Sequence, residues 1–237
     1  MSEPVQDYVC LDLETTGLRP KFDKIIEIGA ARVRKGEIEE TFETFVRPGI
    51  ALPGQITELT GIEEKDLQDA PAIGEVLPGF LDFCRDLPFL GHNIGFDYAF
   101  LKRAAVNAGL ELERSAIDTL KLSRKFLADL PGRRLSDLCA YYRIPLRSHR
   151  ALSDACAAHF LYRRLCGEFY REQDFAPVPL SCRVKKEGPA TKAQKERLQR
   201  LCDRCGIRPD FDPGLLTKNE ASRLIDRILA AHGILQK

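Results

Sequence analysis

Three strand-like segments within the first forty-seven residues limit the possible folds most strongly. Residues 8–14, 25–33 and 41–46 are rich in β-branched, aromatic and other apolar side chains, and the loop at 34–37 contains Gly36. Consecutive strands joined this tightly must pair antiparallel, because a parallel pairing needs a crossover connection of a dozen or more residues. The chain therefore begins with an antiparallel meander.

Beyond the meander, the pattern alternates between helices and short strands. Apolar residues at helical spacing predict helices over 75–87, 96–108, 119–128, 135–143 and 151–169. Short segments at 88–91 and 115–118 fit buried strands. A meander followed by alternating elements predicts an α/β architecture, in which helices flank a mixed sheet.

The C-terminal part has a different character. The stretch 173–190 contains three prolines and is predicted to be a linker. Capping boxes at 191–194 and 217–220 predict the starts of two amphipathic helices. We therefore divide the chain into a main domain (1–172), a linker (173–190) and a small basic helical module (191–237). A unit this small is marginal unless it docks on the main domain or on a partner.

Composition excludes some classes of protein and directs attention to the charge distribution. No apolar stretch is long enough to span a membrane, and the N-terminus lacks a secretory pattern. The eight cysteines are therefore expected to be reduced thiols and the protein to be cytoplasmic. Residues 181–237 carry 13 Lys and Arg against 7 Asp and Glu, although the whole chain has a net charge of only +1. Such a basic appendage suits a phosphate-bearing partner, and a solvated helical surface is an equally open interpretation.

Acidic residues recur at the ends of predicted elements. Asp12 and Glu14 lie on one face of the first strand, because strand side chains alternate with period two. Asp97 falls in the first turn of one helix and Asp154 in the first turn of another. Taken singly, each is more often a solvated or helix-capping acid. Two acids side by side in an apolar strand, however, need a compensating positive charge, for which a hard divalent cation is well suited.

Together the four acids carry a charge that two Mg²⁺ ions would balance, and paired metals can serve phosphoryl transfer. His149, just before Asp154, is the candidate general base, because imidazole titrates near neutral pH.

Three segments now show a resemblance. VCLDLETTG at 9–17, GHNIGFD at 91–97 and HRALSD at 149–154 resemble, in order and spacing, the motifs of the DEDDh 3′→5′ exonucleases. This is the DnaQ-like family that includes the proofreading epsilon subunit of bacterial DNA polymerase III. The likeness covers roughly residues 6–168 and extends to IIEIGA at 25–30 and ITELTGI at 56–62.

The resemblance implies a ribonuclease H-like fold with a five-stranded mixed sheet. It also implies hydrolysis of the 3′-terminal phosphodiester to nucleoside 5′-monophosphates, with two Mg²⁺ ions for which Mn²⁺ can substitute. The implied metal-binding acids are Asp12, Glu14, Asp97 and Asp154, with His149 as general base. The implied substrate contacts are Thr15, Thr16, His92, Asn93 and Leu59.

Purely structural roles stay open for several of these residues. The threonines can instead bond within their own turn, His92 and Asn93 can support the site indirectly, and Leu59 can be a core residue. Asp118 is expected to cap a helix or to act indirectly. Cys202 and Cys205 have the spacing of half a zinc site, but a second pair is missing.

The leading hypothesis is a DNA exonuclease in proofreading or repair, acting on single-stranded or frayed 3′ ends. One alternative is an RNA exonuclease of the same family, because the motifs do not distinguish ribose from deoxyribose. The other is a nucleic-acid binding or assembly module. Candidate partners are a DNA polymerase and, through the loose peptide match at 173–178, a sliding clamp; no membrane is expected. The natural substrate, the partner polymerase and the oligomeric state are not encoded in these patterns.

Overall fold

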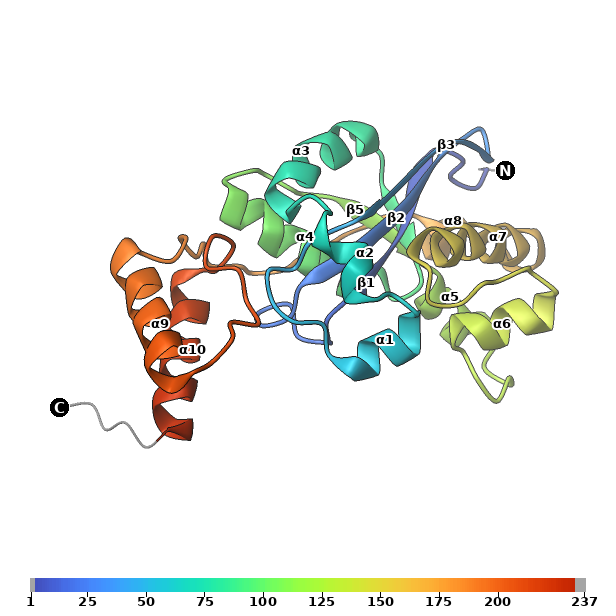
Figure 1. The fold of residues 1–237 in the computed structure, drawn as a ribbon. Helices are drawn as coiled ribbons and strands as arrows, with labels where there is room; N and C mark the ends of the chain where they lie inside the picture. The colour runs from blue at the N-terminus through green and yellow to red at the C-terminus, as the bar shows by residue number, and fades with distance from the viewer. Residues whose placement is uncertain (1–2, 233–237) are drawn as a thin grey trace.

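The computed structural model describes residues 3–232 as a mixed sheet flanked by helices, with a two-helix unit at one end (Figure 1). The sheet has six strands in the order β3-β2-β1-β4-β5-β6. The strands are β1 (Tyr8–Thr15), β2 (Ile25–Arg34), β3 (Glu37–Phe45), β4 (Phe89–Gly91), β5 (Ser115–Asp118) and β6 (Val178–Pro179). The helices are α1 (Gly54–Thr60), α2 (Glu64–Gln68), α3 (Ile73–Cys84), α4 (Ile94–Ala108), α5 (Thr119–Phe126), α6 (Leu135–Tyr142), α7 (Ala151–Phe169), α8 (Glu172–Phe175), α9 (Lys192–Cys205) and α10 (Lys218–Ala231).

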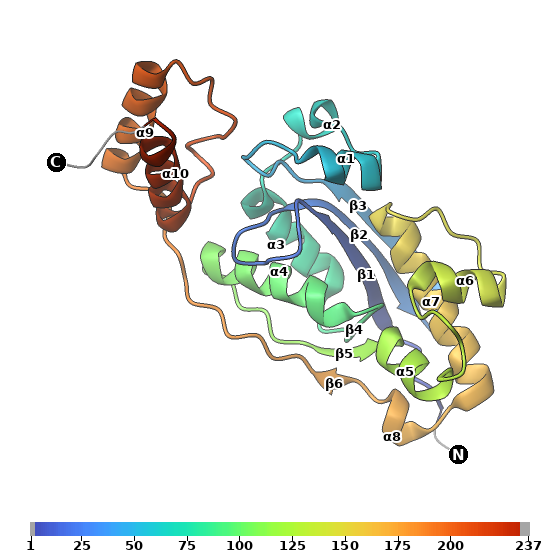
Figure 2. The ribbon, with the colours of Figure 1, turned by 90° about the horizontal axis from the view of Figure 1, so that it is seen from below.

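The predicted meander and the mixed α/β architecture are confirmed. β1, β2 and β3 pair antiparallel, whereas β4 pairs parallel with both β1 and β5. Helices cover both faces of the sheet (Figure 2). One face packs on α3 and α4 with Phe80 and Tyr98 at its centre, and the other packs on α5, α6 and α7 around Tyr8 and Tyr162.

The expected number of strands, five, was wrong. Val178 and Pro179 add a sixth strand, pairing antiparallel with Ala116 and Ser115. The stretch 173–190, predicted to be a linker, thus includes most of α8 and an edge strand. Proline is tolerated there because one side of an edge strand has no ladder partner.

The phenylalanine of the loose clamp-peptide match is not displayed to a partner. Phe175 is only 1% exposed and packs among aromatic rings. Its ring neighbours are Phe126, Tyr162 and Tyr170. The segment therefore packs the end of α7 against the sheet layer. The buried ring of Phe175 is not available for contact with a sliding clamp.

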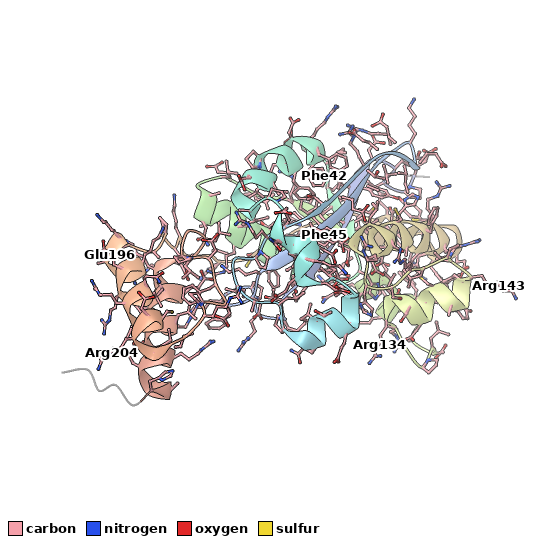
Figure 3. All side chains as sticks on the ribbon, viewed as in Figure 1. Phe42, Phe45, Arg134, Arg143, Glu196 and Arg204 are labelled. Carbon is pink, nitrogen blue, oxygen red and sulfur yellow. The ribbon has the colours of Figure 1, made fainter. Side chains whose placement is uncertain are left out.

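The α9–α10 unit has a small core of its own and docks on the main domain. Leu198, Cys202 and Ile225 are buried within it, so Cys202 serves as a core residue. Figure 3 shows Glu196 and Arg204 on the side of α9 that faces away from the sheet. The predicted module therefore docks, although its last residues, 233–237, lie outside the described part of the chain.

Ion pairs and backbone bonds join this unit to the main domain. Lys24 pairs with Glu220 at 2.5 Å, and Arg47 pairs with Asp212 at 3.1 Å. The Ala51 backbone N–H donates to the Asp210 carbonyl oxygen at 2.7 Å. These contacts involve the β1–β2 loop and the segment leading into α1.

A buried histidine gives the fold a pH-dependent stability. His159 is 2% exposed, and its Nδ1 lies 2.8 Å from the Tyr8 hydroxyl. Burial lowers the pKa of His159 to about 4, below the 6.5 of a free imidazole. The unfolded chain therefore binds more protons between these values, so stability is lost as the pH falls through this window. We expect His159 to contribute about 3 kcal/mol of this loss, measured by urea unfolding without metal.

The control is His159→Gln, which keeps a hydrogen-bond acceptor near Tyr8 and does not titrate. The difference in unfolding free energy between the two proteins should shrink from pH 7 to pH 4, whatever other groups titrate in both. A constant difference would contradict a neutral buried imidazole.

Candidate active site

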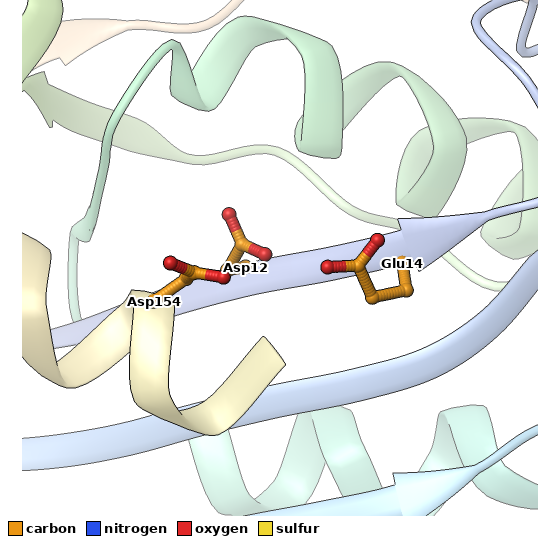
Figure 4. A group of neighbouring side chains, drawn as sticks. All are labelled: Asp12, Glu14 and Asp154. Atoms are coloured by element: carbon orange, nitrogen blue, oxygen red, sulfur yellow. The ribbon is translucent and has the colours of Figure 1, made fainter. Parts of the chain in front are cut away.

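The end of β1 carries two neighbouring carboxylates on the face that packs against α7. Tyr8 and Cys10 belong to the core on that face. Because strand side chains alternate between the two faces, Asp12 and Glu14 point to the same face as Tyr8 and Cys10. Figure 4 shows these acids with Asp154 of α7, their carboxylates facing a common space. Ligand oxygens of the three lie within 4.8 Å of one another. Residues 142 positions apart in the chain are thus brought together.

Asp154 reaches this position because α7 begins very close to the sheet. A Cβ atom on Gly29 of β2 would lie 1.9 Å from the Leu152 backbone nitrogen, which is impossible without displacing the helix. Gly29 is the β2 residue paired with Asp12. The absent side chain therefore permits the close approach of the helix that carries Asp154.

Glu27 fixes the start of the same helix, a role that was not predicted from the sequence. It is fully buried and accepts hydrogen bonds from the Arg150 side chain at 2.8 and 3.1 Å. It also accepts one from the Ala151 backbone N–H at 3.1 Å. The available signal was an acid inside the apolar strand sequence IIEIGA at 25–30.

Asp97, in the first turn of α4, lies near the site but outside the group of three facing carboxylates. It is 3% exposed, and its Oδ1 accepts a hydrogen bond from the Leu13 backbone N–H at 3.0 Å. It is close enough to Asp12 for its charge to raise the pKa of that acid. The structure therefore gathers all four predicted acids, three facing one space and one held against the strand backbone.

The acids destabilise one another's charged forms. Burial, then the charges of Asp97, Asp154 and Glu14, raises the pKa of Asp12 well above its ordinary value. Burial, then Asp154 and Glu27, raises the pKa of Glu14 to about 8. Burial raises the pKa of Asp97 to about 8 and raises that of Asp154 as well.

Cationic side chains of the described residues act on these acids only from beyond ion-pair distance, as the charge of Arg150 does in lowering the pKa of Glu14. No Lys, Arg or His side chain between residues 3 and 232 forms an ion pair with any of the four acids. Clustered oxygen donors of this kind fit a hard divalent cation. The donor set therefore supports a metal site.

His149 lies at the mouth of the site in an unusual backbone conformation. It is exposed, has a φ of 64°, and its backbone N–H donates to Asp154 Oδ2 at 2.8 Å. Non-glycine residues rarely adopt positive φ, and such conformations concentrate at functional sites. The bond to Asp154 joins the candidate base to a candidate ligand.

The acids open into a cavity of about 1090 Å³. Leu59 lines it with 53% of its surface exposed, which rules out the alternative of a packed core leucine. Leu59 belongs to α1, which was not predicted from the sequence because seven residues are too few to show helical periodicity. Leu18, 82% exposed, lines the same cavity.

His92 and Asn93 also line the cavity, and their backbone and ring contacts are structural. His92 Nε2 donates to the Arg133 carbonyl oxygen at 2.9 Å, and Nδ1 lies 2.9 Å from Thr119 Oγ1. The Asn93 backbone N–H donates to Asp118, which also caps α5 as expected. A substrate role for either residue stays a prediction.

Thr15 and Thr16 do not line this cavity. The Thr15 hydroxyl donates to the Gly17 carbonyl oxygen at 2.7 Å, and Thr16 Oγ1 accepts from the Lys24 backbone N–H at 2.9 Å. Both are buried, Thr15 as the last residue of β1 and Thr16 in the loop after it. These contacts match the turn-bonding alternative, and direct substrate contact by the threonines stays a prediction.

Three arginines on the cavity wall were also missed from sequence. Arg124, Arg133 and Arg134 line it, and none of them forms an ion pair within residues 3–232. The adjacent pair at 133–134 was the available signal, but sequence alone did not show which surface it faces. The cavity thus combines acids, exposed leucines and unpaired cations.

Comparison with known proteins identifies the kind of enzyme. A family model described as exonuclease, RNase_T, matches residues 9–162, a range that includes Asp12, Glu14, Asp97 and Asp154. The chain belongs to this exonuclease family. The predicted resemblance to DnaQ-like 3′→5′ exonucleases is confirmed, and the family is one of hydrolytic nucleases.

Several curated proteins described as DNA polymerase III PolC-type are similar to this chain. DNA polymerase III PolC-type of Caldanaerobacter subterraneus subsp. tengcongensis is 42% identical over 160 residues, which are 67% of this chain and 11% of the relative. The Thermotoga maritima protein of the same description is 34% identical over 215 residues, 90% of this chain and 14% of the relative. The chain thus spans about a tenth of the length of these relatives.

Solved structures agree on the fold. Exonuclease X in complex with 5′ overhanging duplex DNA is 24% identical, with a TM-score of 0.57 over 71% of this chain and 96% of that chain. A zinc-bound E. coli ExoI–ssDNA complex is 18% identical, with a TM-score of 0.65 over 72% and 42% of the two chains. No helix within residues 3–232 is long and apolar enough to cross a membrane.

Proposed function

We propose that the chain is a DEDDh 3′→5′ exonuclease that removes nucleoside 5′-monophosphates from DNA with two Mg²⁺ ions. The convergence of Asp12, Glu14 and Asp154 within 4.8 Å carries the proposal. Mn²⁺ is expected to substitute, because both ions favour oxygen ligands. The similarity to PolC-type polymerases supports DNA as substrate and proofreading as setting.

The residues divide into two roles. Asp12, Glu14, Asp97 and Asp154 would hold the cations, which when bound activate water and neutralise charge on the phosphate. His149 would accept the proton of the attacking water. Water oxygen then bonds to phosphorus, the bond from phosphorus to the upstream 3′ oxygen breaks, and a nucleoside 5′-monophosphate leaves.

The exposed leucines suit a frayed end. Leu18 and Leu59 offer apolar surface where an unpaired terminal base can pack, while Arg124 and Arg134 offer charge to phosphates. A paired end must first unstack, so single-stranded or mismatched 3′ ends should react faster.

The test uses 5′-labelled DNA, with Mg²⁺ and with EDTA. We expect a ladder shortened one nucleotide at a time, 5′-monophosphate products and no reaction in EDTA. A phosphorothioate at the last linkage should slow the first step, and matched RNA should react more slowly. Internal cuts or activity in EDTA would refute the mechanism; faster RNA cleavage would refute DNA as the preferred substrate.

A further inference from the structure

Two parts of the chain that are far apart in sequence gather three cationic side chains around one ring. Arg19 Cζ lies 5.1 Å and Lys21 Nζ 5.5 Å from the centroid of Phe22 in the β1–β2 loop. Arg223 of α10 contributes the third, with its Cζ 4.5 Å from the same centroid. These four residues are called the Phe22 cluster.

The Phe22 cluster has an excess of positive charge. Asp23 lies 3.6 Å from Arg19 and offsets one cation. Neither Lys21 nor Arg223 forms an ion pair with a carboxylate of residues 3–232. Each cation lies within 5.5 Å of the Phe22 centroid, so any two lie at most about 11 Å apart. With a Debye length of about 8 Å at physiological salt, their repulsion is reduced but not abolished. A bound anion would relieve it.

The Phe22 cluster continues the rim of the catalytic cavity. Leu18, which lines that cavity, directly precedes Arg19. Figure 1 and Figure 2 both show the loop after β1 extending toward α10. Arg227 is exposed one helical turn beyond Arg223, next to the exposed Asp226.

Cations interleaved with an exposed aromatic ring are suited to single-stranded nucleic acid. Phe22 is 37% exposed, which leaves ring surface available for contact. Grooves that follow a strand combine positive charge for phosphates with rings for bases. An acidic protein segment would need the charge but would gain little from the ring.

We propose that the Phe22 cluster binds the backbone of the substrate strand on the 5′ side of the nucleotide being removed. The α9–α10 unit thereby supplies part of the substrate-binding surface through Arg223. This subsite rests on the proposed function for its orientation, but its affinity can be measured without catalysis.

Binding is measured in EDTA by fluorescence anisotropy with labelled oligothymidylates of about twenty and about four nucleotides. The variants are Lys21→Ala, Arg223→Ala and the pair combined. For the long strand we expect the double variant to raise the Kd on the order of tenfold and to make the plot of log Kd against log salt shallower by about 1.4. The short strand, confined to the cavity, should bind unchanged.

Two controls sharpen this result. Arg223→Lys keeps the charge and should restore most of the affinity. Arg164→Ala removes an exposed arginine from α7, at the other end of the molecule, and should have no effect. Lys21 is exposed in a loop, so its variant tests the proposal even if Arg223→Ala loosens α10.

An unchanged Kd and salt slope in the double variant would overturn the subsite, as would an equal loss in Arg164→Ala. Polyglutamate that competes as well as oligothymidylate of equal charge would overturn the preference for nucleic acid. The proposed function is tested separately, by nucleotide release in Mg²⁺. If the wild type releases nucleotides but the variants bind oligothymidylate as it does, only the subsite is rejected. If the variants lose affinity but the wild type releases no nucleotides, only the proposed function is rejected.

Discussion

Asp12→Asn is expected to abolish nucleotide release and, in the same protein, to raise the melting temperature measured in EDTA. Asparagine has nearly the same shape but removes one charge from the acid cluster. Activity should fall at least about a thousandfold, on the order of 4 kcal/mol in the barrier, because the variant lacks a candidate metal ligand. Single-turnover release from labelled DNA measures this loss.

The gain in stability follows from the raised pKa of Asp12, whose charged form suffers from burial and from the neighbouring acids. A raised carboxyl pKa means that the metal-free wild type loses stability as the pH rises from the ordinary carboxyl pKa toward the raised one. Each 1 kcal/mol recovered by the variant corresponds to about 2–4 °C at this chain length.

The matched control for Asp12→Asn is Asp82→Asn on the exposed surface of α3, which should change neither property. Mg²⁺ should raise the melting temperature of the wild type more than that of Asp12→Asn. An active Asp12→Asn protein, or one less stable than the wild type in EDTA, would contradict the metal-site assignment.

His149→Asn is expected to slow nucleotide release by about two to four orders of magnitude while leaving oligonucleotide affinity intact. Asparagine is the suitable replacement because it tolerates the positive φ of this position and keeps the backbone N–H that donates to Asp154. It cannot take a proton from water, so the loss should appear in kcat rather than in KM.

Arg143→Asn is the matched control for His149→Asn, since Arg143 is also exposed with a positive φ of 56° but lies away from the cavity. Added imidazole should restore part of the rate lost in His149→Asn and none in Asp12→Asn. If His149→Asn kept more than about a tenth of the wild-type kcat, His149 would not be the general base.

Sequence patterns predicted where the four acids lie in the fold, because their placement is local; their roles as metal ligands stay a prediction. Period-two alternation is enough to put Asp12 and Glu14 on one face, and the motifs place Asp97 and Asp154 in first helical turns. The antiparallel meander followed from short connections alone. These features depend on neighbours in the chain, so a single sequence contains them.

Features that depend on distant contacts were not predictable in the same way. Glu27 acts through Arg150, more than a hundred positions away, and looks like an ordinary strand residue until the helix is placed. β6 is two residues long and exists only because β5 offers an edge. α1 is too short for its periodicity to be read, although it carries Leu59 to the cavity.

The close approach of α7 to β2 at Gly29 has a consequence for which cation the site can select. Mg²⁺ demands short, nearly fixed oxygen distances, whereas Ca²⁺ accepts longer and more varied ones. Any side chain at this position would act as a spacer and move Asp154 away from β1. Gly29 has no side chain that could bind a cation, yet it limits the distance between Asp154 and the acids of β1, and so the space for a small cation.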